Sequence, residues 1–397
     1  MTQAEIYTAV PEHLPKNFPF YNWVPKPLGI VFLVILFIPI MTVSGAYTVN
    51  SSEMVGGLGI QSEHIAFISF VTSIGMAAFS PFFYSLVSVR RQKMMSLVGF
   101  SLLAVQSYIC ANTDSLFILA LNSLVMGFVR QTLLMCNLFT LIKYGFGIEA
   151  TRNVTPGNEP KDEAGWDALD TEKKASQPII YFFFMLLGQI GTWITAWFAY
   201  NYQWQMVYYA MLGAILVALL ITLLCMPHNP YPTKHIPLSF SKFGNVVVFC
   251  LMCCSFVYVT VYGKVYDWYD SPSIRWATVI CVVSSLLFFY LEKTRRSPYF
   301  MLKAFKSLSI QGGILLFIGL MICNSSSMLV NIFVGVGMKA DQIQIAALGN
   351  WVLLGYFLGT VIILLLNSRG VHFKWFFAMG FLLIAACLLY TSDAADE

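Results

Sequence analysis

Arg130 is the residue of this chain whose chemistry is hardest to attribute to packing. It lies in the middle of an apolar segment, 116–142, that is long enough to cross a lipid bilayer. A charged side chain at that depth costs about 3 kcal/mol or more unless it faces a cavity or a polar partner. We therefore expect Arg130 to line a polar pathway through the membrane, together with the amides of the same segment: Asn122, Gln131 and Asn137.

Other polar side chains also fall inside apolar segments. Tyr47 and Thr48 end the first segment, and a run of small polar residues occupies the segment 310–334. A pathway between two helix bundles needs such residues at mid-depth. Helix contacts through small residues and interhelical hydrogen bonds explain the run equally well, so both interpretations stay open. The residues of this run that we assign to the pathway are Asn324, Ser325 and Asn331.

The composition predicts an all-α polytopic membrane protein. Hydrophobic residues make up 58% of the 397-residue chain and charged residues 11%, and the mean hydropathy is +0.72. A membrane-spanning helix needs about 20 mostly apolar residues, and about eleven windows approach that length. They are 28–48, 64–86, 94–111, 116–142, 179–200, 204–226, 246–262, 274–291, 310–334, 343–366 and 373–390.

The basic residues predict that the N-terminal segment 1–27 is cytoplasmic. Lys and Arg near the ends of spans favour the cytoplasmic side, and alternate connections between the windows hold most of them. The polar leader has no short apolar core with a small-residue cleavage site, so we expect no cleavable signal peptide.

Proline placement predicts how the spans are grouped. Four prolines within 227–243 cannot continue a helix and predict a cytoplasmic linker. The linker separates a first bundle of six helices, 28–226, from two further helices, 244–292, and a partial second bundle, 293–386. Six spans, a stiff linker and more spans form the layout of a transporter built from repeated six-helix halves.

The first bundle carries two motifs similar to those of the major facilitator superfamily. The segment 80–95, SPFFYSLVSVRRQKMM, occupies the place of the family's Gly-x-x-x-Asp-Arg-x-Gly-Arg-Lys loop, without its aspartate and glycines. In the fourth span, Gly127 and Arg130 resemble the family's intramembrane arginine motif. The basic cluster that the loop retains comprises Arg90, Arg91 and Lys93.

The fifth span resembles a motif of the superfamily's antiporters, and two further segments resemble its fourteen-span EmrB/QacA branch. Gly188 and Gly191, in GQIGTWITAWFA, stand where antiporters carry a glycine-rich, helix-bending motif, although its final Gly-Pro is absent. The segment 262–276, YGKVYDWYDSPSIRW, is similar to the aromatic Trp-x-Ser-Pro-x-Ile segment between the branch's two inserted helices. The segment 291–306, LEKTRRSPYFMLKAFK, resembles its Glu-x-Arg-x-x-Pro-x-x-x-Leu-x-x-Phe segment. The resemblance covers 28–386.

The resemblance implies a major facilitator fold and a secondary active transporter. Such a protein exports drugs or other amphipathic small molecules by proton antiport with alternating access. It lies in the bacterial inner membrane as a multi-pass protein, and its partners are the small-molecule substrate, protons and the lipid bilayer. In a two-membrane bacterium they also include a periplasmic adaptor protein and an outer-membrane channel. The alternatives are an uptake permease for a small metabolite and a non-transporting membrane sensor or scaffold.

Proton coupling needs a group that titrates within the membrane. The predicted spans hold no carboxylate at mid-depth. Glu53, Glu63 and His64 lie at the outer ends of the first two spans, where an outward-open vestibule would reach them. They form our hypothesis for proton coupling.

Enzymatic function is not predicted. The segment 145–177, rich in Pro, Gly and acidic residues, is predicted as a solvated cytoplasmic loop in which 167–174 allow a short surface helix. Its acids form no convergent acid, base or metal cluster, and the chain has no nucleotide-binding loop. Cys250 and Cys253 form a CxxC spacing inside a span, which we interpret as ordinary helix filling. No cofactor, metal or nucleic acid is expected.

The C-terminal residues 387–397, CLLYTSDAADE, match the conceptual translation of a widely used sequencing adapter. We interpret them as an artefact and expect the natural reading frame to continue differently after Ala386. A fourteen-span protein would then have about three further helices beyond this sequence.

Overall fold

The computed structural model describes most of the chain as helices. The described residues are 19–48, 51–82, 92–145, 163–227, 240–294, 305–332, 334, 338, 340–367 and 375–384. The predictions for Arg90, Arg91 and the segment 387–397 lie outside them. The chain divides into two compact units, which are treated separately below: Met1–Glu159 with Ile190–Lys303 (unit 1), and Pro160–Gln189 with Ala304–Glu397 (unit 2).

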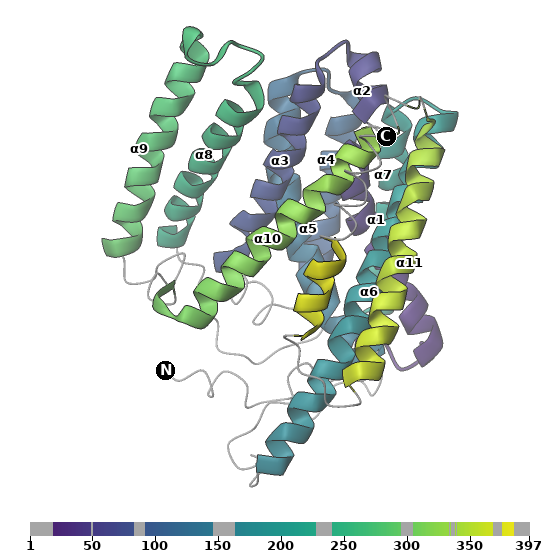
Figure 1. The fold of residues 1–397 in the computed structure, drawn as a ribbon. Helices are drawn as coiled ribbons and strands as arrows, with labels where there is room; N and C mark the ends of the chain where they lie inside the picture. Colours follow the sequence, from purple (N-terminus) through teal and green to yellow (C-terminus); the bar gives the residue numbers. More distant parts are fainter. Residues whose placement is uncertain are drawn as a thin grey trace. The chain divides into compact units, whose positions relative to one another are not determined.

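The described residues form helices and no strand (Figure 1). Eight helical segments among them are long and apolar enough to cross a membrane, and Lys26–Thr42, Ile310–Ile322 and Trp375–Ile384 are shorter apolar ones. The predicted class of an all-α polytopic membrane protein is therefore confirmed. The helices are α1 (Lys26–Thr48), α2 (Ser51–Leu58), α3 (Ser62–Ala78), α4 (Gln92–Asn112), α5 (Leu116–Gly145), α6 (Glu163–Asn201), α7 (Gln205–Cys225), α8 (Phe240–Tyr262), α9 (Pro272–Thr294), α10 (Leu308–Ile332) and α11 (Gln342–Asn367), with short 3₁₀ turns η2 (Ser80–Phe82) and η4 (Trp268–Asp270).

Two elements differ from the sequence prediction. The short helix α2 stands between the first two spans, where we predicted no element. Helix α6 begins at Glu163, inside the segment predicted as a loop, and continues without a break to Asn201. Its 39 residues extend about 58 Å at 1.5 Å per residue, against a bilayer core of about 30 Å. Extending an existing helix avoids the unfavourable nucleation step, so a polar stretch with Glu, Ala and Lys can join the span.

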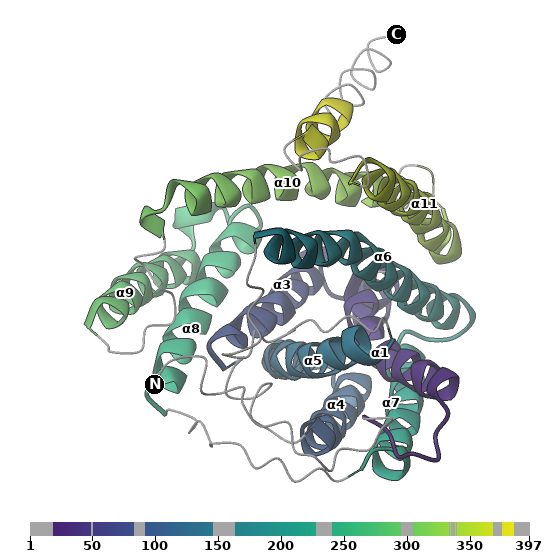
Figure 2. The same ribbon diagram turned by 90° about the horizontal axis from the view of Figure 1, so that it is seen from below.

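Helix α5 is the centre of unit 1. It packs against α1, α3 and α4, while α7 packs against α1 and α4. Viewed along the helices, α5 lies between α3 and α4, with α1 beside it (Figure 2). The buried residues of α5 therefore face these three neighbouring helices, whereas Phe117, Leu121 and Val125 lie on its exposed face.

The contact between α3 and α5 is made by glycine on both sides. A Cβ added to Gly75 would overlap the carbonyl oxygen of Leu124, and one added to Gly127 would overlap the carbonyl oxygen of Thr72. Small residues that let two backbones approach are typical of helix pairs in membranes, where apolar burial alone does not drive association. The glycines thus fix the spacing of α3 and α5.

Unit 2 contains a close pair of helices, which are α11 and the part of α6 that ends at Gln189. The side-chain amide of Gln189 donates to the carbonyl oxygen of Ala346 (2.8 Å) and to Oδ1 of Asn350 (3.1 Å). Further along the pair, the rings of Phe182 and Phe357 lie 5.5 Å apart. These contacts show that the two helices run antiparallel.

Candidate functional site

Arg130 lies where three helices of unit 1 meet. Its side chain is buried, with 8% of its surface exposed. Nε donates to the carbonyl oxygen of Ile40 on α1 (2.9 Å), and Nη1 donates to Sδ of Met76 on α3 (3.3 Å). A backbone carbonyl is one of the partners by which proteins stabilise an intramembrane charge. The guanidinium therefore links α5 to both α1 and α3.

The glycine contact explains why Met76 reaches the guanidinium. Gly127 precedes Arg130 by three residues, which places the two on neighbouring positions of one face of α5. The backbone of Thr72 and Met76 lies against Gly127. Because α3 approaches so closely there, the thioether of Met76 extends over the next turn of α5 to Arg130.

The α1 backbone around Ile40 is adapted to contact with other helices. Pro39 lies inside α1 and has no N–H, so the carbonyl of Ile35, more than one turn before the carbonyl that Arg130 uses, has no helical donor. On α6, Gly191 packs against the backbone of Met41 and Thr42: an added Cβ would lie 3.2 Å from the carbonyl carbon of Met41. By contrast, a Cβ at Gly188 would meet nothing within 4 Å. Of the two predicted glycines, Gly191 thus lies at a helix crossing.

The predicted amides on α5 bond elsewhere. Nδ2 of Asn122 donates to the carbonyl oxygen of Gln106 (2.9 Å) and to Sγ of Cys110 (3.0 Å), both on α4. Nδ2 of Asn137 donates to the carbonyl oxygen of Leu133 in its own helix (2.8 Å), and Gln131 is half-buried. The bonds of Asn122 join α5 to α4, and the bond of Asn137 stays within α5. Neither amide is hydrogen-bonded to the guanidinium of Arg130 in these contacts.

A polar seam between α4 and α5 was not predicted. The side chains of Gln92 and Thr140 are hydrogen-bonded across it. Ser96 and Asn137, one turn further in, are fully buried, and Oγ of Ser96 and Oδ1 of Asn137 have no hydrogen-bond partner. The signal in the sequence is the recurrence of polar or small residues every three to four positions from Gln92 along α4, which marks one helix face.

For several predicted residues of α1, α2 and α10, the structure describes the helical backbone but not the side chain. Their proposed roles in the pathway or in proton coupling therefore stay predictions. These residues are Tyr47, Thr48, Glu53, Asn324, Ser325 and Asn331.

At the N-terminal end of α3, Glu63 and His64 are both half-buried. Ser62 donates to Oε2 of Glu63 (3.0 Å), and Nδ1 of His64 lies 2.5 Å from the hydroxyl oxygen of Tyr262 on α8. The structure therefore joins His64 to a helix that lies almost two hundred residues away in the chain. No pattern in the sequence predicts this partner.

Lys93, the one member of the predicted basic cluster within the described residues, caps α7. Its Nζ donates to the carbonyl oxygens of Leu223 (2.8 Å) and Met226 (2.7 Å). A cation at a helix C-terminus satisfies carbonyls that have no helical donor and interacts favourably with the helix dipole. At the other end of the same antiparallel pair, the hydroxyl of Tyr209 donates to Asn112 (3.0 Å).

Lys93→Met is expected to lower the free energy of unfolding by about 1 kcal/mol, because the last carbonyls of α7 lose a charged donor. Lys93→Arg keeps a cationic donor and serves as the control. Thermal unfolding of the purified protein measures both. A midpoint for Lys93→Met equal to that of wild type would contradict the capping role.

The described residues contain no group of three or more His, Cys, Asp or Glu side chains that could hold a metal ion. Neither a family model nor a curated protein sequence matches the chain. The resemblance to the EmrB/QacA branch stays a prediction from the sequence.

Proposed function

We propose that the chain is a secondary active transporter of the EmrB/QacA branch of the major facilitator superfamily, which exports amphipathic small molecules from a bacterial cell in exchange for protons. The observation that carries the proposal is the buried guanidinium of Arg130, held at mid-span by a backbone carbonyl of α1 and a thioether of α3. The motifs at 80–95, 262–276 and 291–306 support the choice of family.

A purely structural role does not explain an arginine at position 130. A buried charge carries a desolvation cost that an apolar residue of similar size avoids. The partners of Arg130 are a carbonyl oxygen in α1 and a thioether in α3, and neither of them carries a charge. A contact of this kind can be exchanged for a contact with substrate or water when α1 shifts, which is the requirement of alternating access at a site near the bilayer midplane.

Glycine contacts support the same function. The crossing at Gly75 and Gly127 brings the backbone of α5 against the backbone of α3, beside the contact between Met76 and Arg130. Such a crossing holds α5 and α3 together as a stiff pair. Stiff pairs move as bodies, and alternating access is largely rigid-body motion.

Transport is tested with the protein expressed from its complete gene and reconstituted into liposomes. With a proton gradient directed to drive export, we expect uphill movement of a fluorescent amphipathic dye and dissipation of the gradient when the dye is added. Dye movement without proton movement would contradict antiport. Absence of dye movement, with gradient-driven uptake of a nutrient in the same vesicles, would replace the exporter by a permease.

A further inference from the structure

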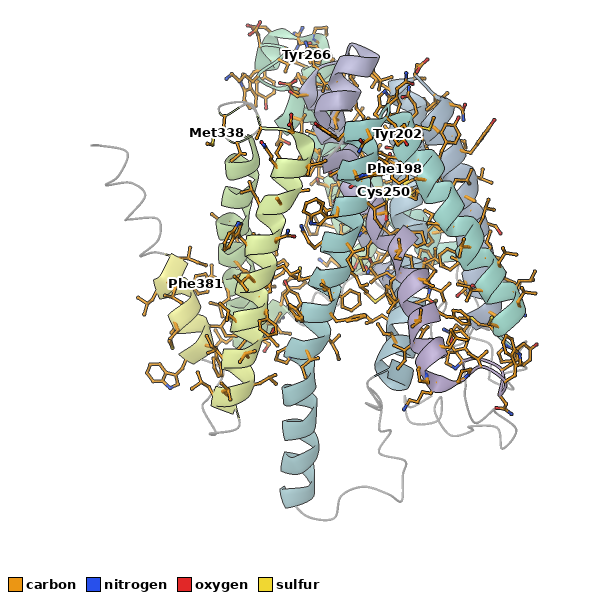
Figure 3. The ribbon with its side chains drawn as sticks, turned by 90° about the vertical axis from the view of Figure 1, so that its right-hand side faces the viewer. Phe198, Tyr202, Cys250, Tyr266, Met338 and Phe381 are labelled. Atoms are coloured by element: carbon orange, nitrogen blue, oxygen red, sulfur yellow. The ribbon has the colours of Figure 1, made fainter. Side chains whose placement is uncertain are left out.

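Helices α8 and α9 form a hairpin, and α8 attaches it to α3. Helices α3 and α8 run antiparallel. Near one end, Ala78 and Phe82 pack with Val246 in a buried cluster that Cys250 joins. At the other end, Phe67 meets Tyr258 with ring centroids 5.9 Å apart. Tyr266 lies in the connection after α8, at the top of the view in Figure 3.

The outer end of this contact holds one polar pair inside an aromatic cluster. The hydroxyl of Tyr262 lies 2.5 Å from Nδ1 of His64, and only 4% of the Tyr262 surface is exposed. The ring of Tyr262 packs against those of Tyr258 (4.7 Å) and Tyr266 (5.7 Å). Glu63, the residue before His64, is half-buried, and its Oε2 accepts a hydrogen bond from Ser62 (3.0 Å).

Protonation of a histidine in this setting reverses its hydrogen bond. A neutral ring with its proton on Nε2 accepts the Tyr262 hydroxyl proton at Nδ1, whereas an imidazolium has a donor at both nitrogens. After one proton is taken up from the outer solution, Nδ1–H of His64 donates to the Tyr262 oxygen. The hydroxyl proton of Tyr262 must then turn away from the imidazole ring, and the half-buried carboxylate of Glu63 favours the positive charge on the neighbouring His64.

We propose that Glu63, His64 and Tyr262 form a proton-binding site at the outer ends of α3 and α8. In the protonated state the site contains an imidazolium, a phenol and a carboxylate. Charge-assisted hydrogen bonds are roughly twice as strong as neutral ones, so proton uptake tightens the attachment of α8 to α3. The site does not depend on export, and its test needs no transport measurement.

Other titratable and charged groups near the site lie on α8 and in the connection that follows it. On α8, Tyr258 faces Phe67 of α3 and Tyr262. In the connection after α8, the side chains of Lys264 and Asp267 are exposed. Histidine is the side chain that ordinarily changes charge between about pH 5 and pH 8, so a response in that range singles out His64 among these groups.

Hydrogen–deuterium exchange of the intact protein in lipid nanodiscs tests the site. We expect the backbone amides of 258–266 to exchange about fivefold more slowly at about pH 5.5 than at about pH 8, after correction for intrinsic exchange rates, because the docked state is stabilised by the charged bond. The backbone amides of α4 and α5 in the same sample, corrected for intrinsic exchange rates in the same way, serve as the internal reference and should show no such pH difference.

Four variants assign the response. His64→Gln keeps a polar side chain that does not titrate, and Tyr262→Phe keeps the ring without the hydroxyl; both are expected to remove the pH difference. Glu63→Gln is expected to reduce it. Tyr258→Phe leaves the pair of His64 and Tyr262 in place and should behave as wild type. Equal exchange at both pH values in the wild-type protein, or an undiminished difference in His64→Gln, would overturn the proposal.

Discussion

Arg130→Met is expected to abolish export while leaving the protein as stable as wild type or more so. Replacing a buried charge with an apolar side chain of similar volume is often neutral or stabilising, because the desolvation cost disappears. The carbonyl of Ile40 keeps a helical donor four residues further along α1. Loss of activity without loss of stability separates a transport role of Arg130 from a structural one.

The rate of dye export by the reconstituted protein measures the first effect, and thermal unfolding measures the second. We expect export to fall at least about 100-fold, the factor that corresponds to ~3 kcal/mol of interaction with a buried charge. Arg130→Lys keeps the charge but not the planar donor fork, so it should retain part of the activity. Export by Arg130→Met at the wild-type rate would remove Arg130 from the mechanism.

The sequence is sufficient to predict the apolar helices because the bilayer imposes a length and a polarity on each span. Within the described residues, eight of the eleven predicted windows contain a helical segment long and apolar enough to cross a membrane. All the apolar windows contain helix within the described residues. The importance of Arg130 follows from the same argument, since an ionisable residue at mid-span is costly wherever it occurs. Its burial is observed, whereas its contacts with Ile40 and Met76 depend on which helices surround α5.

The partners of polar side chains are less predictable from sequence. Asn122 and Arg130 share one span, yet the amide bonds to α4 and the guanidinium to α1 and α3. Periodicity assigns a residue to a face of a helix but does not say which helix lies opposite. The same limit applies to His64, whose partner Tyr262 is fixed by the packing of α8 on α3.

Gly127→Ala is expected to destabilise the protein by about 3 kcal/mol, the upper range for overpacking a close contact. The added Cβ would overlap the carbonyl oxygen of Thr72, which belongs to the backbone of α3 and cannot rotate away as a side chain does. The two helices must separate, and Met76 then moves away from Arg130. We therefore expect a lower midpoint of thermal unfolding together with reduced export.

Gly213→Ala on α7 is the matched control, because a Cβ there meets nothing within 4 Å. Alanine is a better helix former than glycine by about 1 kcal/mol, so this variant should be unchanged or slightly more stable. Gly75 makes the reciprocal contact in the same crossing. Once one alanine has separated α3 from α5, a second one meets less resistance, so Gly75→Ala combined with Gly127→Ala should cost less than the sum of the single changes. Full additivity would show that the two glycines act at independent contacts, and a neutral Gly127→Ala would show that α3 and α5 are not held at this spacing.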